Sequence, residues 1–121
     1  MKNKILYIII SALVVFSCTY DSPDDLIDNT VLPVGNVTYM AHVKPIIDNN
    51  CINCHSMPPQ NGAPMPLVSY QNVKIAVENR GLIQLIATQD LGDVMPLGGP
   101  RLPQNLIDTV VQWQTDGFLE E

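Results

Sequence analysis

The chain carries two thiols and one imidazole within a run of five residues. Their spacing is C-x-x-C-H, formed by Cys51, Cys54 and His55, and it is typical of covalent attachment of haem c. Each thiol can form a thioether with one haem vinyl group, and the adjacent histidine can then ligate the iron. The run therefore predicts one covalent haem, with Cys51 and Cys54 as anchors and His55 as an axial ligand.

Two other kinds of site also use a C-x-x-C pair, namely zinc sites and thiol–disulfide exchange motifs. A zinc site needs two further ligands, and only Cys18 and His42 remain as good candidates. Cys18 has a separate expected use in the leader. An exchange motif is expected between a strand and a helix, and the residues around Cys51 show no such pattern. Haem attachment is the favoured interpretation, and the alternatives stay open.

A haem used for electron transfer usually has a second axial ligand, and Met95 is the best candidate here. It lies in a glycine-rich loop, residues 92–99, just before the last expected helix. Pro96 favours an extended backbone at Met95, and the glycines allow the backbone to approach a flat cofactor closely. A methionine with apolar neighbours can equally be a core residue, so the loop alone does not decide.

Other side chains compete with Met95 for the iron. Met57 lies only two residues after His55 and is not expected to reach the opposite haem face. Met65 lies in the loop expected beside His55, and Met40 lies in the first expected helix. His42 is the serious rival because imidazole is a good iron ligand; its other interpretation is a histidine at a helix surface.

The elements that position these side chains are expected to be helices. Thr38 can cap a first helix, which Pro45 should kink or restart. The apolar stripe of this helix comprises Met40, Val43, Ile46 and Ile47. Further helices are expected from Ser69 to about Asn79 with Gly81 at the C′ position, over 82–88, and over 103–115 with Pro103 in the first turn. No run alternates strictly enough to predict a sheet, so the predicted fold class is all-α.

Proline- and glycine-rich loops are expected over 56–68 and 90–101. The first loop follows His55, whose second ring nitrogen needs a hydrogen-bond acceptor if the other ligates a metal. A backbone carbonyl near Pro64 or Pro66 could be that acceptor, and the sequence does not choose between them.

This arrangement resembles the small single-haem cytochromes c. In that family C-x-x-C-H lies near the start of a mostly helical domain, and a ligand methionine, often followed by proline, precedes a C-terminal helix with an aromatic residue. The matching residues are Cys51, Cys54 and His55 for attachment, Met95-Pro96 for the ligand loop and Trp113 for the helix. The resemblance covers about residues 38–118. It implies a cytochrome c-like domain wrapped around haem, with Met95 as the distal ligand.

The first residues have the layout of an export signal. Lys2 and Lys4 precede an apolar run, residues 5–16, that is shorter than the ~20 residues needed to span a bilayer. Residues 15–18 then resemble a bacterial lipobox, in which the cysteine, here Cys18, becomes the lipidated N-terminus. An ordinary signal peptide or an uncleaved anchor is the alternative.

Three segments are therefore expected: a signal peptide over 1–17, a lipidated Cys18 with an acidic tether over 18–37, and a haem domain over 38–121. Apolar residues near the end of the tether would also let it pack on the domain as an extended arm. The formal charge of the 121-residue chain is −6, and it falls to −8 when Lys2 and Lys4 leave with the signal. This acidity disfavours nucleic acid as a partner and favours redox partner proteins with a basic docking face.

The function predicted from the sequence is electron transfer by an exported c-type cytochrome, anchored in a membrane and facing the periplasm or the cell exterior. No clustered acid–base pair or nucleophile–base arrangement indicates catalysis on a substrate. The alternatives are a five-coordinate haem sensor, a haem-bearing subunit of a larger oxidoreductase, and a non-haem lipoprotein that binds a partner.

Overall fold

The computed structural model describes residues 33 and 35–121, so the expected signal peptide, Cys18 and most of the expected tether lie outside it. The described residues form helices and loops without a strand, which confirms the predicted all-α class for this part of the chain. None of these helices is long and apolar enough to cross a membrane. The helices are η2 (Tyr39–Val43), α2 (Lys44–Asn50), α3 (Tyr70–Asn79), α4 (Leu82–Ala87) and α5 (Gln104–Thr115).

The first helical segment changes type next to Pro45, where the prediction expected a kink or a restart: the π-helical turn η2 ends at Val43 and α2 begins at Lys44, with helical backbone angles at both residues. Thr38 is the N-cap, and its hydroxyl oxygen accepts a hydrogen bond from the Ala41 N–H at 3.4 Å. Pro45 lacks an N–H, and its ring would clash with the carbonyl of Ala41, four residues earlier. The chain responds with the wider π-helical turn η2, in which the Lys44 N–H bonds to the Tyr39 carbonyl. Helix α2 follows, with proline in its first turn.

The π-helical turn changes which side chain faces the core. Met40, predicted in the apolar stripe, is 50% exposed, and that prediction is wrong. Tyr39 is buried instead, because the wider turn shifts the helical register ahead of α2. The other three stripe residues, Val43, Ile46 and Ile47, are buried as expected.

The predicted helix boundaries in the second half of the chain agree closely with the structure. Ser69 caps α3 by accepting from the Asn72 N–H at 3.3 Å. Gly81 follows α3 with a φ of 68°, the left-handed conformation that favours glycine, and α4 begins at the next residue. Pro103 is the N-cap of α5 rather than a residue of its first turn, so that helix starts one residue later than predicted.

The C-terminal tail is fastened to the start of the domain around Trp113, which is fully buried. Its ring packs on Tyr39 and Phe118, with centroid separations of 5.8 and 4.9 Å. The Leu119 carbonyl accepts hydrogen bonds from the Trp113 ring N–H and from the Tyr39 backbone N–H, both at 2.8 Å. The Tyr39 N–H lies at the start of η2 and has no acceptor within its own helix, so the Leu119 carbonyl satisfies it.

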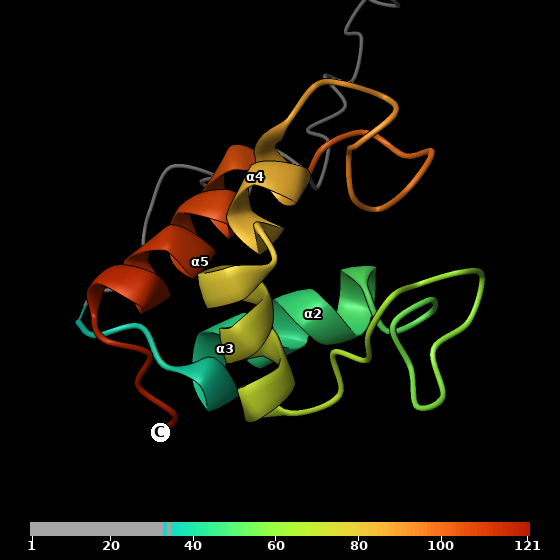
Figure 1. Cartoon of the computed structure of the whole chain (residues 1–121). Coiled ribbons are helices and arrows are strands. Elements are labelled where there is room, and N and C mark those ends of the chain that lie inside the picture. Colours follow the sequence, from blue (N-terminus) through green and yellow to red (C-terminus); the bar gives the residue numbers. More distant parts are fainter. Residues whose placement is uncertain (1–32, 34) are drawn as a thin grey trace, which may run out of the picture.

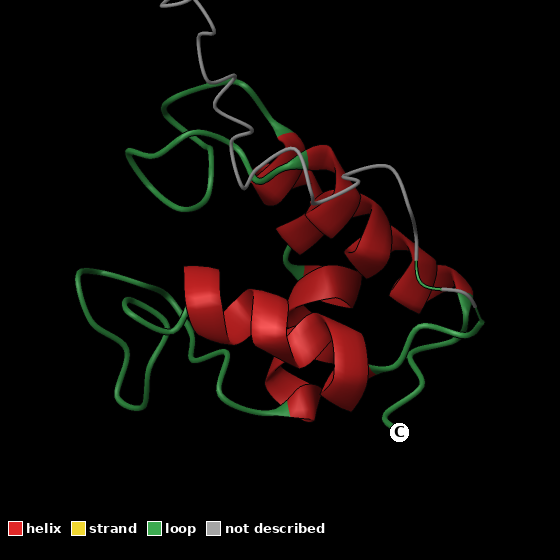
Figure 2. Cartoon of the chain, turned by 180° about the vertical axis from the view of Figure 1, so that it is seen from behind, coloured by secondary structure: helices red, strands yellow, loops and turns green. Residues whose placement is uncertain are grey.

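The helices pack in pairs, with α5 against η2 and α4, and α3 against α4. Both long loops, residues 51–69 and 88–103, project from the same end of the molecule, away from the C-terminus (Figure 1). The view from behind shows the same arrangement (Figure 2). This end, called here the loop end, carries all the predicted haem-binding residues.

Candidate functional site

The two thiols and the imidazole lie on a single turn that continues from α2. Cys51 is the C-cap of α2, and its N–H bonds to the Ile47 carbonyl at 2.8 Å. The Cys51 carbonyl then accepts from the N–H groups of Cys54 and His55, at 3.2 and 2.9 Å. Cys51 and Cys54 are free thiols, and both are half-buried. The turn thus holds the three side chains of the motif close together on a defined backbone.

His55 is oriented by the loop that follows it. Its Nδ1 lies 2.8 Å from the carbonyl oxygen of Met65, the residue between Pro64 and Pro66. A carbonyl can only accept, so Nδ1 donates and Nε2 of the neutral ring keeps its lone pair. That is the state in which an imidazole ligates a metal, with its other nitrogen held by a second group. The sequence indicated this part of the loop and left the carbonyl undetermined.

Burial determines the protonation state of the Cys51 thiol. Burial raises the pKa of Cys51 to about 11, so the thiol is protonated at neutral pH. Thiolates are the species that ligate zinc and attack disulfides. Within residues 33 and 35–121, moreover, no three His, Cys, Asp or Glu side chains gather as a metal ion would require. Neither the zinc nor the exchange interpretation gains support from the described residues.

Cys54 is supported by the first loop. The Asn61 side-chain amide lies 3.5 Å from the Cys54 sulfur, and the Gln60 N–H donates to the Cys54 carbonyl at 2.7 Å. Sequence reasoning missed both contacts, because nothing in the composition of a polar loop shows which residue folds back onto the motif. The loop therefore braces Cys54 as well as His55.

Met95 is placed by a bond to a neighbouring helix. Its N–H donates to the carbonyl of Leu85 in α4 at 2.9 Å, and its side chain is half-buried. The preceding residue, Val94, is only 1% exposed and anchors the loop in the protein. The role of Leu85 was not predicted, because a backbone acceptor leaves no signal in the residue type. Met95 is thus held at the loop end rather than free at the tip of its loop.

The competing methionines are less well placed. Met57 is 67% exposed and Met40 is 50% exposed. Met65 is half-buried, but its carbonyl bonds to Nδ1 of His55, so its backbone lies beside the nitrogen that does not ligate metal. This agrees with the expectation that its loop lies on the His55 side.

His42 is engaged as a helix cap. Its Nδ1 accepts a hydrogen bond from the Thr38 backbone N–H at 3.0 Å. The neutral ring then carries its proton on Nε2, which has no lone pair left for a metal. His42, a residue of η2, also lines a groove between η2–α2 and α5 that includes none of the residues of the C-x-x-C-H motif. In this structure His42 therefore serves as a hydrogen-bond acceptor at the start of the first helix.

Several apolar side chains pack on the core and yet stay partly exposed. Among them are Cys51, Ile52, Met65, Ile83, Ala87, Met95 and Leu106. They come from the turn after α2, both long loops, α4 and the first turn of α5. Burying such surface contributes roughly 25 cal/mol per Å², so a flat apolar group seated among them would stabilise the domain. The His55 imidazole and the Met95 thioether are of the donor types that ligate haem iron, and these side chains are of the apolar kind that suits the haem plate.

Comparison with known proteins adds no relative to this description. No family model matches the chain, and no curated protein and no solved structure matches it either. Function is therefore inferred from the side chains described above.

Proposed function

We propose that the chain is a single-haem c-type cytochrome that transfers electrons. The observation that carries the proposal is the state of His55: it shares one turn with Cys51 and Cys54, and its Nδ1 is held by the Met65 carbonyl. Covalent attachment of haem requires two closely spaced thiols. Iron ligation requires a histidine next to them whose other ring nitrogen is hydrogen-bonded, and His55 meets both conditions.

Each residue has a separate task in this proposal. The thiols of Cys51 and Cys54 add across the two haem vinyl groups, so that each forms a carbon–sulfur bond and gives its hydrogen to the vinyl group. The addition is balanced without an oxidant. His55 is the proximal ligand through Nε2, and Met95 is the distal ligand through its thioether sulfur. When bound, the haem supplies one-electron chemistry between ferric and ferrous iron.

Two ligands from the protein favour electron transfer over substrate chemistry. If His55 and Met95 both ligated the iron, no iron position would stay open to a substrate, and the methionine ligand would raise the reduction potential. The backbone bond between Met95 and Leu85, which fixes the loop on α4, supports this assignment. The domain proposed for residues 38–121 is thus a cytochrome c-like fold wrapped around haem.

The location and partners follow from the parts of the chain that lie outside the described residues. Residues 1–17 serve as a signal peptide, and Cys18 carries the lipid that holds the protein at a membrane, facing the periplasm or the cell exterior. Formal charge falls to −8 after removal of Lys2 and Lys4. A redox partner with a basic docking face suits this charge, and nucleic acid does not.

Expression with a cytochrome c maturation system tests the proposal directly. The expected result is a band that stains for haem on a denaturing gel, because the thioethers survive denaturation. The double variant Cys51→Ser/Cys54→Ser should lose this band, and Cys18→Ser, which removes the one cysteine outside the motif, should keep it. Absence of covalent haem from the wild-type chain would instead favour a non-haem lipoprotein.

The same preparation separates electron transfer from sensing. A low-spin spectrum in both oxidation states is expected for iron with two protein ligands. A high-spin wild-type protein that binds carbon monoxide readily would indicate a five-coordinate haem sensor or enzyme subunit instead.

A further inference from the structure

The two loops at the loop end carry large apolar side chains that the fold leaves in water. Among the large apolar residues that the structure describes, Leu91, Met57 and Leu97 are the most exposed, at 75, 67 and 67%. Met57 lies in the loop over residues 51–69, and both leucines lie in the loop over residues 88–103. Both loops project from the same end of the molecule (Figure 1). Single exposed apolar residues are common, whereas three at one end, on the loops that carry the proposed haem ligands, indicate an interaction surface.

Two turns display the leucines, and backbone hydrogen bonds close both of these turns. Around Leu91, the carbonyl of Asp90 accepts from the Val94 N–H at 2.8 Å. Around Leu97, a second backbone bond of 3.0 Å closes the next turn. Such positions are usually occupied by glycine, proline or small polar residues. Because the backbone of these turns is already fixed, a partner that covers the leucines loses little binding free energy to ordering the loop.

Leu91 also borders a hollow of about 260 Å³ on the second loop. Val94 and Pro100 line the same hollow and make it largely apolar. It is smaller than the usual pocket for a small-molecule ligand, roughly 300–1,000 Å³. Interfaces between proteins are often centred on one side chain that fills a pocket of the partner. The hollow therefore suits a side chain of another protein.

The charges of the two loops are few, and they select among possible partners. The first loop contains no Asp, Glu, Lys or Arg, and the second contains Asp90, Asp93 and Arg101. Both carboxylates are exposed and lie within two residues of Leu91, whereas Arg101 is half-buried. Anionic lipid headgroups would repel these carboxylates, and a second copy of the chain would bring the same carboxylates into one interface. A protein with basic groups beside an apolar face complements them.

We propose that the loop end is the docking surface for a redox partner protein whose contact face is apolar and rimmed by lysine or arginine. Leu91, Leu97 and Met57 make the apolar contact, and Asp90 and Asp93 pair with the basic rim. Charge at the rim mainly sets the rate of encounter, and apolar burial mainly sets the affinity of the bound complex. This inference rests on the proposed electron transfer, and it adds which residues the partner touches and by which chemistry.

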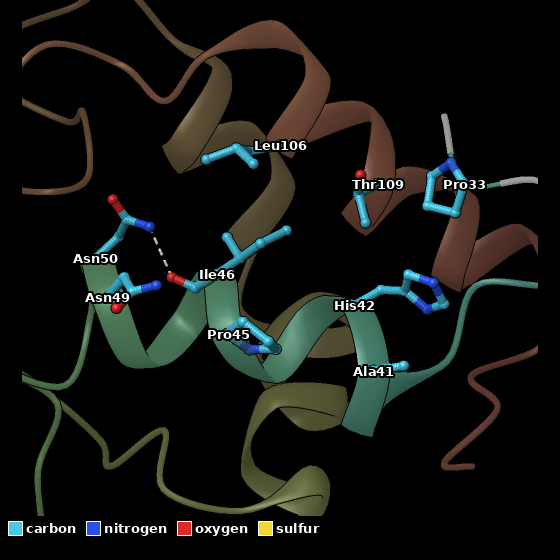
Figure 3. A pocket seen from close by; sticks show the side chains of 9 residues that line it. All are labelled: Pro33, Ala41, His42, Pro45, Ile46, Asn49, Asn50, Leu106 and Thr109. Atoms are coloured by element: carbon cyan, nitrogen blue, oxygen red, sulfur yellow. Dashed lines mark hydrogen bonds between the residues drawn. The ribbon is translucent and has the colours of Figure 1, made fainter. Parts of the chain in front are cut away.

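A separate groove of about 330 Å³ lies between the first helical pair and α5 (Figure 3). Ile46 and Leu106 face each other across this groove, and none of its lining residues belongs to the two loops. Its lining contains no carboxylate. The groove therefore offers apolar surface without the charges of the loop end, and it serves as an internal reference for the experiment below.

The apolar trication tris(phenanthroline)chromium(III) tests this surface on the full mature, haem-loaded protein in its ferrous state. It combines the apolar surface and the positive charge expected of the partner, and its unpaired electrons broaden the nuclear magnetic resonance signals of nearby protons. The methyl signals of Leu91, Leu97 and Met57 should broaden first, and those of Ile46 and Leu106 should stay sharp. Tris(ethylenediamine)chromium(III), which has the same charge and no aromatic surface, should bind about tenfold more weakly.

Matched variants separate the apolar contact from the charge. Leu91→Ser/Leu97→Ser should weaken binding of the phenanthroline complex about tenfold. Met40→Ser/Val111→Ser, which changes exposed apolar residues on η2 and α5, should leave that binding unchanged. Asp93→Asn removes a charge and no apolar surface, so it should weaken the binding of both chromium complexes alike. Circular dichroism verifies that each variant remains folded.

The outcomes that overturn the docking surface are equally definite. Equal binding by the two double variants, or broadening centred on the groove, would overturn it. A wild-type dimer in sedimentation that Leu91→Ser/Leu97→Ser abolishes would assign the loop end to a second copy of the chain, and binding to phosphatidylcholine vesicles that the same variant loses would assign it to a lipid surface. The absorption spectrum separates these failures from failure of the proposed function. A protein without haem would overturn both proposals, and a low-spin haem protein whose loop signals stay sharp would overturn the docking surface alone.

Discussion

Nδ1 of His55 donates to the carbonyl oxygen of Met65, and the two atoms lie 2.8 Å apart. The backbone repeats the connection two residues later, where the Leu67 N–H donates to the His55 carbonyl, also at 2.8 Å. The ring is therefore fixed in tautomer and in direction by the loop on its own side. Because such a bond increases the basicity of a ligating imidazole, it should influence the iron as well as the fold.

The variant Pro66→Ala tests this influence. Pro66 restricts Met65 to an extended backbone, and its loss should loosen the carbonyl that holds His55. A weaker bond makes the imidazole a poorer donor, so the reduction potential should rise. The free energy of unfolding should fall by about 0.4–1 kcal/mol through the greater freedom of the unfolded chain. Potentiometric titration and denaturant unfolding measure the two effects.

A matched control separates the two causes. Pro59→Ala removes a proline from the same loop at a position that makes no hydrogen bond to His55. The free energy of unfolding of Pro59→Ala should fall by a similar amount, and its reduction potential should stay at the wild-type value. Equal potentials in the two variants would mean that the Met65 carbonyl does not tune the iron.

The distal ligand can be identified by substituting each candidate in turn. Met95→Ala should open the sixth coordination position, lower the reduction potential and let carbon monoxide bind readily. Met57→Ala and Met65→Ala should remain low-spin. His42→Ala should also keep its spectrum and lose about 0.5–1.5 kcal/mol of stability, because the Thr38 N–H loses its acceptor. Absorption spectra with and without carbon monoxide distinguish these cases.

A reversal of the spectra would contradict the assignment. A high-spin His42→Ala protein beside a low-spin Met95→Ala protein would make His42 the second ligand. It would also require the cap between His42 and Thr38 to break when haem is bound.

The local features of the fold were largely predictable from the sequence. Caps such as Thr38 and Ser69, the irregular helix next to Pro45 and the left-handed Gly81 each depend on a few neighbouring residues and on steric rules that act locally. For the same reason the ends of α3 and α4 were predicted to within a residue. The C-x-x-C-H turn belongs to this group, since Cys51, Cys54 and His55 follow one another in the chain.

The contacts between distant segments were not predictable in the same way. The wider π-helical turn exposes Met40 and buries Tyr39. It accommodates the steric demand of Pro45 while the neighbouring side chains still pack on the core, and the apolar pattern of the sequence did not indicate it. The bond from Met95 to Leu85 uses a backbone carbonyl, which every residue has. Sequence therefore predicted the side chains of the proposed site, and the groups that orient them required three-dimensional structure.

The aromatic cluster around Trp113 should dominate the stability of the domain. Trp113→Ala should cost about 3–5 kcal/mol, since it removes a fully buried ring. Trp113→Phe keeps an aromatic ring and loses the bond to the Leu119 carbonyl, for a smaller cost of about 1–2 kcal/mol. Val111→Ala, on the exposed side of α5, should change stability by about 0.5 kcal/mol or less. Denaturant unfolding of the haem-loaded proteins measures these differences, and equal values for the three variants would contradict the role of the cluster.

Membrane attachment should depend on Cys18, the residue proposed to carry the lipid. Cleavage would remove the apolar run of residues 5–16, and among residues 33 and 35–121 no helix could take its place in a membrane. Each acyl CH₂ buried in a bilayer contributes about 0.8 kcal/mol, so Cys18→Ala should move the protein into the soluble fraction or leave it unprocessed. Thr19→Ala, the neighbouring control, should stay with the membranes. Intact mass spectrometry of the wild type should show acyl chains on Cys18, and an unmodified N-terminus beyond residue 18 would reject the lipoprotein proposal while leaving the haem site untouched.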